Sequence, residues 1–292
     1  MKYMEKYSTS ELMAAFVSRQ IHNDDVVFIG IGLPLVAGVV AVATHAPKAT
    51  LIYEGGGIGA RTRRVPWSIS DNPTTDNAIA AVPMWRVFSD MQAGYVTLGI
   101  VGGAEIDRFG NLNTTAIYGS GGSYQRPKVR LAGSGGANDI ASSAGRLIIM
   151  MRLEEGKFVD RVQFVTTPGY LSGSTAREEA GLIGGGPEYV VTQKCIFAFD
   201  EKTKEMYLKL LYPGVTVEEI KQLVGWDLKV ASDLDAPEPP TEQQVGLMTA
   251  FDPDGSIMKT PKIARDKLED FDAFYELIKT AYESNHVYNS QT

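Results

Sequence analysis

The sequence predicts an α/β protein with an open, mostly parallel sheet, flanking helices, an antiparallel hairpin and a C-terminal helical appendage. Short apolar runs with glycine shortly after them, such as residues 26–29 and 51–53, alternate with segments of helical periodicity. An apolar run bounded by glycine is typical of a buried parallel strand. Strands joined through a helix make a right-handed crossover and therefore lie parallel. We expect one domain over residues 1–252 and a helical extension over 253–292.

The composition of the chain argues against several classes of protein. The chain has 292 residues and a formal net charge of −7 at pH 7, with a pI near 5.1, which argues against a nucleic-acid-binding protein. No apolar run approaches the roughly 20 residues that a membrane span needs. A single cysteine, Cys195, excludes an internal disulfide. The N-terminus lacks the apolar core of a signal peptide, so we expect a cytoplasmic protein without membrane partners.

The first half of the pattern forms a β-α-β unit. Ser8 and Glu11 fit a capping box for a helix over 8–20. A strand over 26–29 precedes a helix over 35–44, for which Pro34 suits the first turn. The strand over 51–53 follows. Because the two strands are expected to be parallel, the turn after the first and Glu54 after the second should open on the same edge of the sheet.

The remaining elements are predicted from the same signals. Asp107 and Gly110 bound a tight turn. Residues 200–204 connect two predicted strands, and this polar connection predicts an antiparallel hairpin. From residue 236 the sequence becomes Pro-rich and then charged. Helices are expected over 83–91, 138–144, 216–223 and, as a charged amphipathic segment, 262–284; strands are expected over 95–101, 128–131, 147–151, 161–165, 189–192, 196–199 and 206–211.

Glu54 is the candidate for covalent chemistry. A carboxylate at the carboxyl end of a buried strand faces the crevice where open α/β sheets bind ligands, and the glycine run after it lets a substrate approach closely. The alternative is a glutamate that ends a strand before a flexible turn. The glycine run at 133–137 precedes a small-residue helix, which is a natural oxyanion site because backbone amides are exposed there.

The inventory of side chains excludes several other mechanisms. The three histidines have no metal-ligand spacing, and no G-x-S-x-G elbow exists. Gly30 and Gly32 lack the third glycine of a dinucleotide fingerprint, and no Walker A sequence occurs. We interpret Cys195 as a core residue. A carboxylate nucleophile and amide-rich turns remain, and glutamate can form an acyl intermediate when it attacks a thioester.

Several motifs in order resemble family I CoA-transferase β subunits, and most closely those of glutaconate CoA-transferase. The similarity runs from about residue 10 to about residue 252. Its motifs are Gly30-Ile-Gly-Leu-Pro34, Glu54-x-Gly56, Val65-Pro-x-Ser-x-x-Asp71, Gly102-Gly-Ala-x-Ile-Asp-x-x-Gly-Asn-x-Asn113, Gly133-Ser-Gly-Gly-Ala-Asn138, Val165-Thr-x-Pro-Gly169, Val190-Val-Thr192 and Phe199-Asp-Glu-Lys-Thr-Lys204.

The resemblance implies a reaction and roles for single residues. Glu54 would attack an acyl-CoA, form an acyl-glutamyl anhydride and then a glutamyl-CoA thioester, and pass CoA to an acceptor acid in a ping-pong cycle. The oxyanion would be bound by backbone amides. These amides correspond here to Ile31 or Gly32 and to Gly136, with Gly135 and Ala137 as neighbours.

The resemblance also implies partners. The chain would be one half of the active site, and it would require a separate α subunit, often in an α2β2 heterotetramer. Its substrates would be a coenzyme A thioester and a carboxylic acid such as a glutaconate-like dicarboxylate, with no metal and no permanently bound cofactor.

Two departures from the family pattern bear on the substrate. Gly55 stands where the family usually has Ser or Asn, and Glu105 replaces a frequent Gln. Arg61 and Arg64 follow the nucleophile loop and are candidates for a substrate carboxylate or a CoA phosphate; the alternative is a solvated basic surface. We also predict substrate or CoA contacts for four further positions: Gly55, Gly56, Glu105 and Asn138.

Two other functions stay open on the sequence. The same fold could serve a CoA-ester hydrolase, a C–C bond-cleaving enzyme or a decarboxylase, although such relatives usually lack the glutamate of the E-x-G motif. A non-catalytic acyl-CoA-binding subunit is the third hypothesis. Reaction of Glu54 with an acyl-CoA discriminates among the three.

Overall fold

The computed structural model describes residues 2–258. The chain forms two compact units, which are described separately: unit 1 comprises Met1–Val87 and the chain from Glu238 onward, and unit 2 comprises Phe88–Pro237. The helix predicted over 262–284 lies outside the described residues, and the predicted domain boundary at residue 252 stays a prediction. Within residues 2–258, none of the helices has the length and apolar character needed to cross a membrane.

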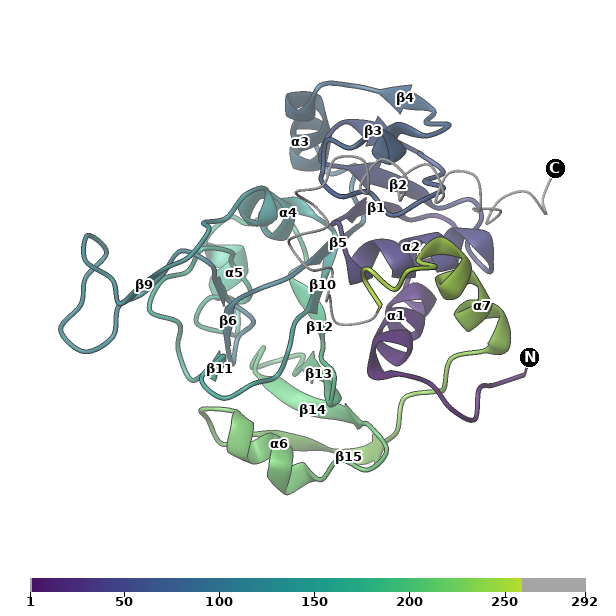
Figure 1. Cartoon of the computed structure of the whole chain (residues 1–292). Helices are drawn as coiled ribbons and strands as arrows, with labels where there is room; N and C mark the ends of the chain where they lie inside the picture. Colours follow the sequence, from purple (N-terminus) through teal and green to yellow (C-terminus); the bar gives the residue numbers. More distant parts are fainter. Residues whose placement is uncertain (1, 259–292) are drawn as a thin grey trace. The chain divides into compact units, whose positions relative to one another are not determined.

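Unit 1 contains the β-α-β unit that the sequence predicts (Figure 1). Val26 to Ile29 of β1 pair in parallel with Thr50 to Tyr53 of β2, and β3 and β4 continue the sheet in antiparallel pairing. Its elements are α1 (Thr9–Arg19), β1 (Val26–Ile29), α2 (Leu33–Ala43), β2 (Thr50–Tyr53), β3 (Gly57–Ile58), the 3-10 helix η1 (Asn72–Thr75), β4 (Ala80–Ala81) and α7 (Glu242–Phe251).

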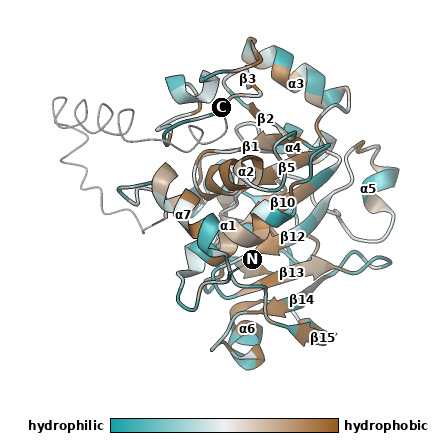
Figure 2. Ribbon diagram, turned by 90° about the vertical axis from the view of Figure 1, so that its right-hand side faces the viewer, coloured by the Kyte–Doolittle hydropathy of each residue, from teal (hydrophilic) through white to brown (hydrophobic). Residues whose placement is uncertain are grey.

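The helices of unit 1 follow from their caps and their apolar content. Ser8 and Glu11 form the predicted capping box of α1, and Pro34 lies in the first turn of α2. Nearly every side chain of α2 is apolar and buried, and Figure 2 shows this helix as a continuous hydrophobic segment. At Gly38 a Cβ atom would lie 2.2 Å from the Ile29 Cδ1 atom, so a larger residue there would require the end of the Ile29 side chain to move.

Unit 2 is built on a mixed sheet in the strand order β15-β14-β13-β12-β10-β5. The strands β5, β10 and β12 are parallel, and β12, β13 and β14 are antiparallel, so the hairpin predicted at 200–204 is confirmed. These strands are β5 (Leu98–Val101), β10 (Arg146–Met150), β12 (Pro187–Val191), β13 (Cys195–Phe199), β14 (Met206–Leu211) and β15 (Lys229–Asp235).

Smaller elements complete unit 2. One short sheet joins β6 (Glu105–Asp107), β7 (Leu112–Asn113) and β11 (Phe158–Val159), and another pairs β8 (Ala116–Ile117) with β9 (Val129–Arg130). The helices are α4 (Ala137–Ser143), α5 (Ala176–Glu179) and α6 (Val217–Leu223). Helix α3 (Met84–Gln92) spans the boundary between the two units.

The predicted α/β class is confirmed, with several local differences. Residues 161–165 form no strand. Instead, the Val162 amide donates to Asp107 Oδ2 at 3.4 Å, and the Gln163 side-chain oxygen accepts from the Tyr118 amide at 2.7 Å. The elements that were not predicted are the helices α5 and α7, strand β15 and the short strands β3, β4, β6, β7, β8 and β11. The strand over 95–101 is shorter than expected and begins at Leu98.

Candidate active site

Glu54 is the first residue after β2 and lies next in the chain to a buried strand end. Its side chain is half-buried, and burial raises the pKa of the Glu54 carboxyl above its ordinary value. Within the described residues the carboxylate forms no hydrogen bond and no ion pair. The preceding residue is anchored, because the Tyr53 hydroxyl and Thr62 Oγ1 lie 2.6 Å apart. Glu54 is thus a positioned carboxylate whose oxygens remain available.

The glycines after Glu54 are packed against backbone carbonyls. A Cβ atom on Gly55 would lie 2.1 Å from the Ile69 carbonyl oxygen, and one on Gly56 would lie 1.8 Å from that of Val82. Gly56 also has φ +110°, which side chains rarely adopt. The run is therefore required by the internal packing of unit 1, whatever a substrate needs in addition.

The turn after β1 opens on the same edge as Glu54. The register pairs Ile29 with Tyr53, so Ile31 and Glu54 both follow the carboxyl ends of adjacent parallel strands. Gly32 is the N-cap of α2, with φ +106°. In the described part of the chain, the amides of Ile31 and Gly32 donate no hydrogen bond. They are free donors at a helix N-terminus, where an anion is favoured.

The basic cluster has mostly internal partners. Arg64 is buried and donates to both carboxylate oxygens of Asp71, at 3.0 and 3.1 Å. Arg61 donates to the Pro47 carbonyl at 2.8 Å, and Arg63 lies 3.5 Å from Asp76. Arg64 thus organises its own loop. Asp71, its partner, was not singled out as a functional residue, although it ends one of the family motifs.

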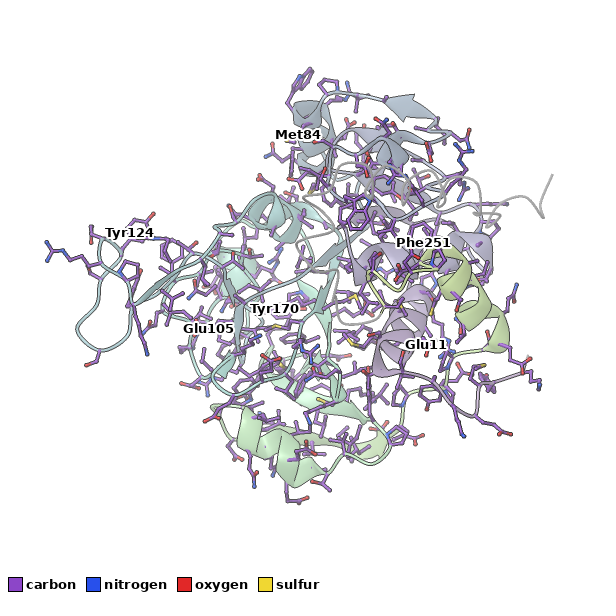
Figure 3. The ribbon with its side chains drawn as sticks, viewed as in Figure 1. Glu11, Met84, Glu105, Tyr124, Tyr170 and Phe251 are labelled. Atoms are coloured by element: carbon purple, nitrogen blue, oxygen red, sulfur yellow. The ribbon has the colours of Figure 1, made fainter. Side chains whose placement is uncertain are left out.

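In unit 2, Glu105 begins β6 and is buried; Figure 3 labels this residue. Asn113 Nδ2 donates to Glu105 Oε2 at 2.8 Å and to the Ala116 carbonyl at 2.8 Å. Burial raises the pKa of the Glu105 carboxyl; the nearby Asp107 adds to this, and the Asn113 hydrogen bond opposes it. Asn113 is the supporting residue that the sequence did not identify.

The predicted turn at 107–110 is held by one carboxylate. Asp107 Oδ1 accepts from the amides of Phe109 and Asn111 at 3.0 and 3.1 Å, and the Gly110 amide donates to the Asp107 carbonyl at 2.9 Å. The Asn111 side chain donates in turn to the Leu171 carbonyl at 2.8 Å. These contacts fix the segment that carries Glu105 to the rest of unit 2.

The glycine run at 133–137 leads into α4, as predicted. Gly136 is the N-cap of this helix. The Ala137 amide donates to the Ser134 carbonyl at 3.0 Å, whereas those of Gly135 and Gly136 donate to nothing in the part of the chain described. Asn138 is exposed, and its Oδ1 lies 3.5 Å from Ser142 Oγ. Of the three predicted amides, Gly135 and Gly136 are the two available donors.

Within residues 2–258, neither Cys195 nor a group of metal-ligand side chains forms a competing site. Cys195 is fully buried, as predicted, and burial raises the pKa of its thiol to about 12. Among the described residues, no group of three or more His, Cys, Asp or Glu side chains is arranged to hold a metal ion.

Comparison with known proteins places the chain in a family. A family model described as coenzyme A transferase matches residues 10–223. One subunit of the 3-oxoadipate CoA-transferase of Pseudomonas knackmussii is 38% identical over 250 residues, which are 85% of this chain and 95% of that protein. The chain belongs to the coenzyme A transferase family.

Glutaconate CoA-transferase of Acidaminococcus fermentans is similar in sequence and in structure. One of its subunits is 37% identical over 267 residues, covering 89% of this chain and 98% of the relative. The crystal structure of that enzyme has a chain that superposes with a TM-score of 0.79 at 36% identity, over 89% of this chain and 100% of that one. Three predictions are thus confirmed: the family resemblance that the motifs indicated, the fold class and the enzyme class.

A third match concerns the fold alone. The decarboxylase AibA/AibB has a TM-score of 0.73 at 23% identity, over 86% of this chain and 97% of that one. The same architecture thus occurs in a protein named for a different reaction, so the chemistry must be argued from the residues of the site.

Proposed function

We propose that this chain is the β subunit of a heteromeric CoA-transferase that moves CoA between an acyl-CoA and a carboxylic acid. The observation that carries the proposal is the half-buried carboxylate of Glu54 at the carboxyl end of β2. The relatives are named for 3-oxoadipate and glutaconate. A dicarboxylate or a related acid is therefore the substrate class that we propose for this chain.

The first half-reaction loads CoA onto Glu54. A carboxylate oxygen of Glu54 attacks the thioester carbonyl, the C–S bond breaks, and CoA leaves as the thiolate from an acyl-glutamyl anhydride. The thiolate then attacks the glutamyl carbonyl of the anhydride. This releases the first acid as its carboxylate and leaves a glutamyl-CoA thioester.

The second half-reaction runs the same steps in reverse with another acid. The acceptor carboxylate attacks the glutamyl thioester and releases the CoA thiolate. The thiolate attacks the acyl carbon of the new anhydride, which forms the product thioester and restores the Glu54 carboxylate. No proton is lost or gained over the cycle, so the site needs no general base.

Backbone amides would stabilise the tetrahedral intermediates. The free amides of Ile31 and Gly32 lie on the edge of unit 1 that carries Glu54, and those of Gly135 and Gly136 precede α4 in unit 2. Removing one oxyanion donor typically costs on the order of 10²–10³ in kcat. We propose these amides as the oxyanion donors, with Ala137 as a neighbour whose own amide is engaged.

Recognition of the substrates would involve both subunits. We propose Gly55, Gly56, Glu105 and Asn138 as contacts to the acyl-CoA. Arg61 is a better candidate than Arg64 for a substrate anion, because Arg64 is engaged by Asp71. A separate α subunit would supply the remaining contacts, in an α2β2 assembly.

The test is covalent labelling of Glu54. The co-expressed complex of both subunits is incubated with an acyl-CoA in the absence of an acceptor acid, quenched in acid and digested. We expect the Glu54 peptide to gain the mass of CoA less one water. The Glu54→Gln variant should give no such peptide and no measurable transfer. Glu5→Gln, the same change at an exposed residue of unit 1, should behave as the wild-type chain.

The same experiment separates the other hypotheses. Consumption of acyl-CoA with an unmodified Glu54 peptide would replace the proposal by a hydrolase, a C–C bond-cleaving enzyme or a decarboxylase. An unmodified peptide with acyl-CoA bound but unchanged would indicate a non-catalytic binding subunit.

A further inference from the structure

One buried arginine of unit 2 is held by backbone rather than by a carboxylate. The Arg177 side chain on α5 is 4% exposed, and within the described residues it forms no ion pair. Burial lowers the pKa of its guanidinium, although arginine keeps its charge in proteins. A buried charge is costly unless hydrogen bonds compensate it. The contacts that hold Arg177 are therefore essential to the packing around it.

Backbone carbonyls supply all of these contacts. A guanidinium carries five N–H groups in a rigid planar fork, and Arg177 donates to as many carbonyls. The acceptors are Gly184 (2.7 Å from Nε), Gly169 and Pro168 (2.8 and 3.3 Å from Nη1), and Ala141 and Ser142 (2.5 and 3.4 Å from Nη2). One planar group thus joins three segments of unit 2.

The first of these segments is the end of α4, which Figure 1 shows beside α5. Ala141 and Ser142 lie in the last turn of α4, where the final carbonyls of a helix have no partner within it. The Gly184 amide also donates to the Ser142 carbonyl, at 2.9 Å. A helix of 7 residues is too short to be stable by itself, so the position of α4 depends on such contacts.

The other end of α4 carries the proposed oxyanion donors. Gly136 is the N-cap, and the amides of Gly135 and Gly136 are the free donors described above. The helix is about 10 Å long, at 1.5 Å per residue, and moves as one body. Ile140 packs closely on β5, since a Cβ atom at Gly99 would lie 2.4 Å from Ile140 Cγ2. A shift at the carbonyl end of α4 is therefore transmitted to the two amides.

The second segment leads to Glu105. The carbonyls of Pro168 and Gly169 end a family motif to which the proposed reaction gives no role. The Gly169 amide donates to Asn111 Oδ1 at 2.9 Å, in the turn that fixes the segment carrying Glu105. A Cβ atom on Gly169 would lie 2.4 Å from the Phe109 carbonyl oxygen, so the two loops are tightly packed. The guanidinium thus joins α4 to the segment that carries Glu105.

We propose that Arg177 is a positioning residue for CoA transfer. By binding these carbonyls it fixes α4, and with it the amides of Gly135 and Gly136, relative to the segment that carries Glu105. The inference rests on the proposed function, because those amides are the oxyanion donors proposed there. Its effect falls on the tetrahedral intermediates and not on the binding of acyl-CoA, since the amides act where the negative charge develops.

The test is Arg177→Lys in the co-expressed complex of both subunits. Lysine keeps the charge but presents three N–H groups on one atom, so it cannot span carbonyls on three segments. Loading of CoA on Glu54 is measured as a single-turnover rate against acyl-CoA concentration. We expect the maximal rate to fall by roughly 10–100-fold and the half-saturating concentration to change by less than about twofold, because only transition-state contacts are lost.

A double-mutant cycle distinguishes positioning from general stability. Gly136→Pro removes one proposed donor, and the φ of −80° at Gly136 suits proline. If Arg177 acts through this amide, Arg177→Lys should slow loading in the Gly136→Pro chain by at least about threefold less than in the wild-type chain. Effects of the two changes that simply multiply would overturn the inference.

Thr192→Val is the matched control. Thr192 is fully buried in unit 2, and its hydroxyl donates to the Cys195 carbonyl at 2.7 Å, so the change lowers stability without contact to α4. All rates are measured well below the lowest melting temperature of the complexes. We expect Thr192→Val to melt at a lower temperature and to load CoA at the wild-type rate. Loading as slow as in Arg177→Lys would show that lost stability sets the rate.

Gly184→Ala perturbs the same joint from the other side. A Cβ atom there would lie 2.4 Å from the Ala144 carbonyl oxygen and 3.0 Å from Arg177 Nη2, so the end of α4 must shift. We expect the same fall in maximal rate. Wild-type loading in a folded Arg177→Lys complex, or in Gly184→Ala where Arg177→Lys does not fold, would overturn the inference. Absence of CoA on Glu54 in the wild-type complex would instead overturn the proposed function, so the two failures are distinguishable.

Discussion

The α-carbon of Gly55 packs so closely on Ile69 that a Cβ atom there would lie 2.1 Å from the Ile69 carbonyl oxygen. The obstacle is backbone, which cannot rotate away as the end of a flexible side chain can. Coenzyme A transferase relatives were expected to have Ser or Asn at this position. In this chain the segment that carries Ile69 occupies the volume which such a side chain would fill.

Gly55→Ser should therefore damage the loop that carries Glu54. The added side chain must displace residues near Ile69, and overpacking of this kind costs roughly 1–3 kcal/mol. We expect a lower melting temperature of the complex and slower loading of CoA on Glu54. Gly246→Ser is the control, because a Cβ atom at Gly246 meets nothing within 4 Å. Wild-type melting and loading in Gly55→Ser would show that the loop accommodates the side chain.

The paired hydrogen bonds between Arg64 and Asp71 predict a structural role for Arg64. Arg64→Met removes both contacts and leaves the Asp71 carboxylate without them, at a cost of roughly 1.5–3 kcal/mol for hydrogen bonds to a charged group. Thermal melting of the complex measures the loss. Arg61→Met should change stability by less than about 0.5 kcal/mol, because Arg61 donates to a single carbonyl at the surface.

Kinetics distinguish the two arginines further. If Arg61 binds a substrate anion, Arg61→Met should raise KM while the melting temperature holds. A raised KM in Arg64→Met with unchanged stability would contradict the structural role of Arg64.

Local signals in the sequence were sufficient to predict where the candidate site residues lie on the strands and helices. Glu54, the turn at Gly32 and the glycines before α4 were placed correctly at strand ends and helix N-termini because capping, periodicity and glycine act over a few residues. The supporting partners were not predictable in this way. Asp71 is seven residues from Arg64 and Asn113 eight from Glu105, and only the folded loop shows that each pair meets.

The errors have physical causes as well. Residues 161–165 alternate like a strand, but the Val162 amide donates to Asp107 and the Gln163 side chain accepts from the Tyr118 amide. Strand β15 lies at an edge and is largely exposed, so it lacks apolar alternation. Helix α7 had a readable signal in the capping box formed by Thr241 and Gln244, which the Pro-rich segment before it obscured.

Glu105 predicts a pH dependence of stability. Its pKa in the folded chain is raised, chiefly by burial, so the folded state holds this proton more tightly than the unfolded state. Stability therefore falls as pH rises from the unfolded pKa through the folded pKa, and it stays lower above that range. Glu105→Gln is neutral and its side-chain oxygen can still accept from Asn113. We expect it to melt at a higher temperature than the wild-type chain at pH 8 and at the same temperature near pH 4.

The pH profile of transfer should report the carboxyl of Glu54. The nucleophile is the carboxylate, and burial raises its pKa, so activity is lost as pH falls through a pKa above the ordinary value of glutamate. The first half-reaction isolates this group: loading of CoA on Glu54 is measured as an initial rate against pH, at acyl-CoA concentrations well below KM. We expect an acid limb with a slope of one. Glu5→Gln should leave the limb in place, since it alters an exposed carboxyl of the same unit. A rate that stays constant down to the ordinary pKa of glutamate would mean that partner contacts in the complex offset the burial of Glu54.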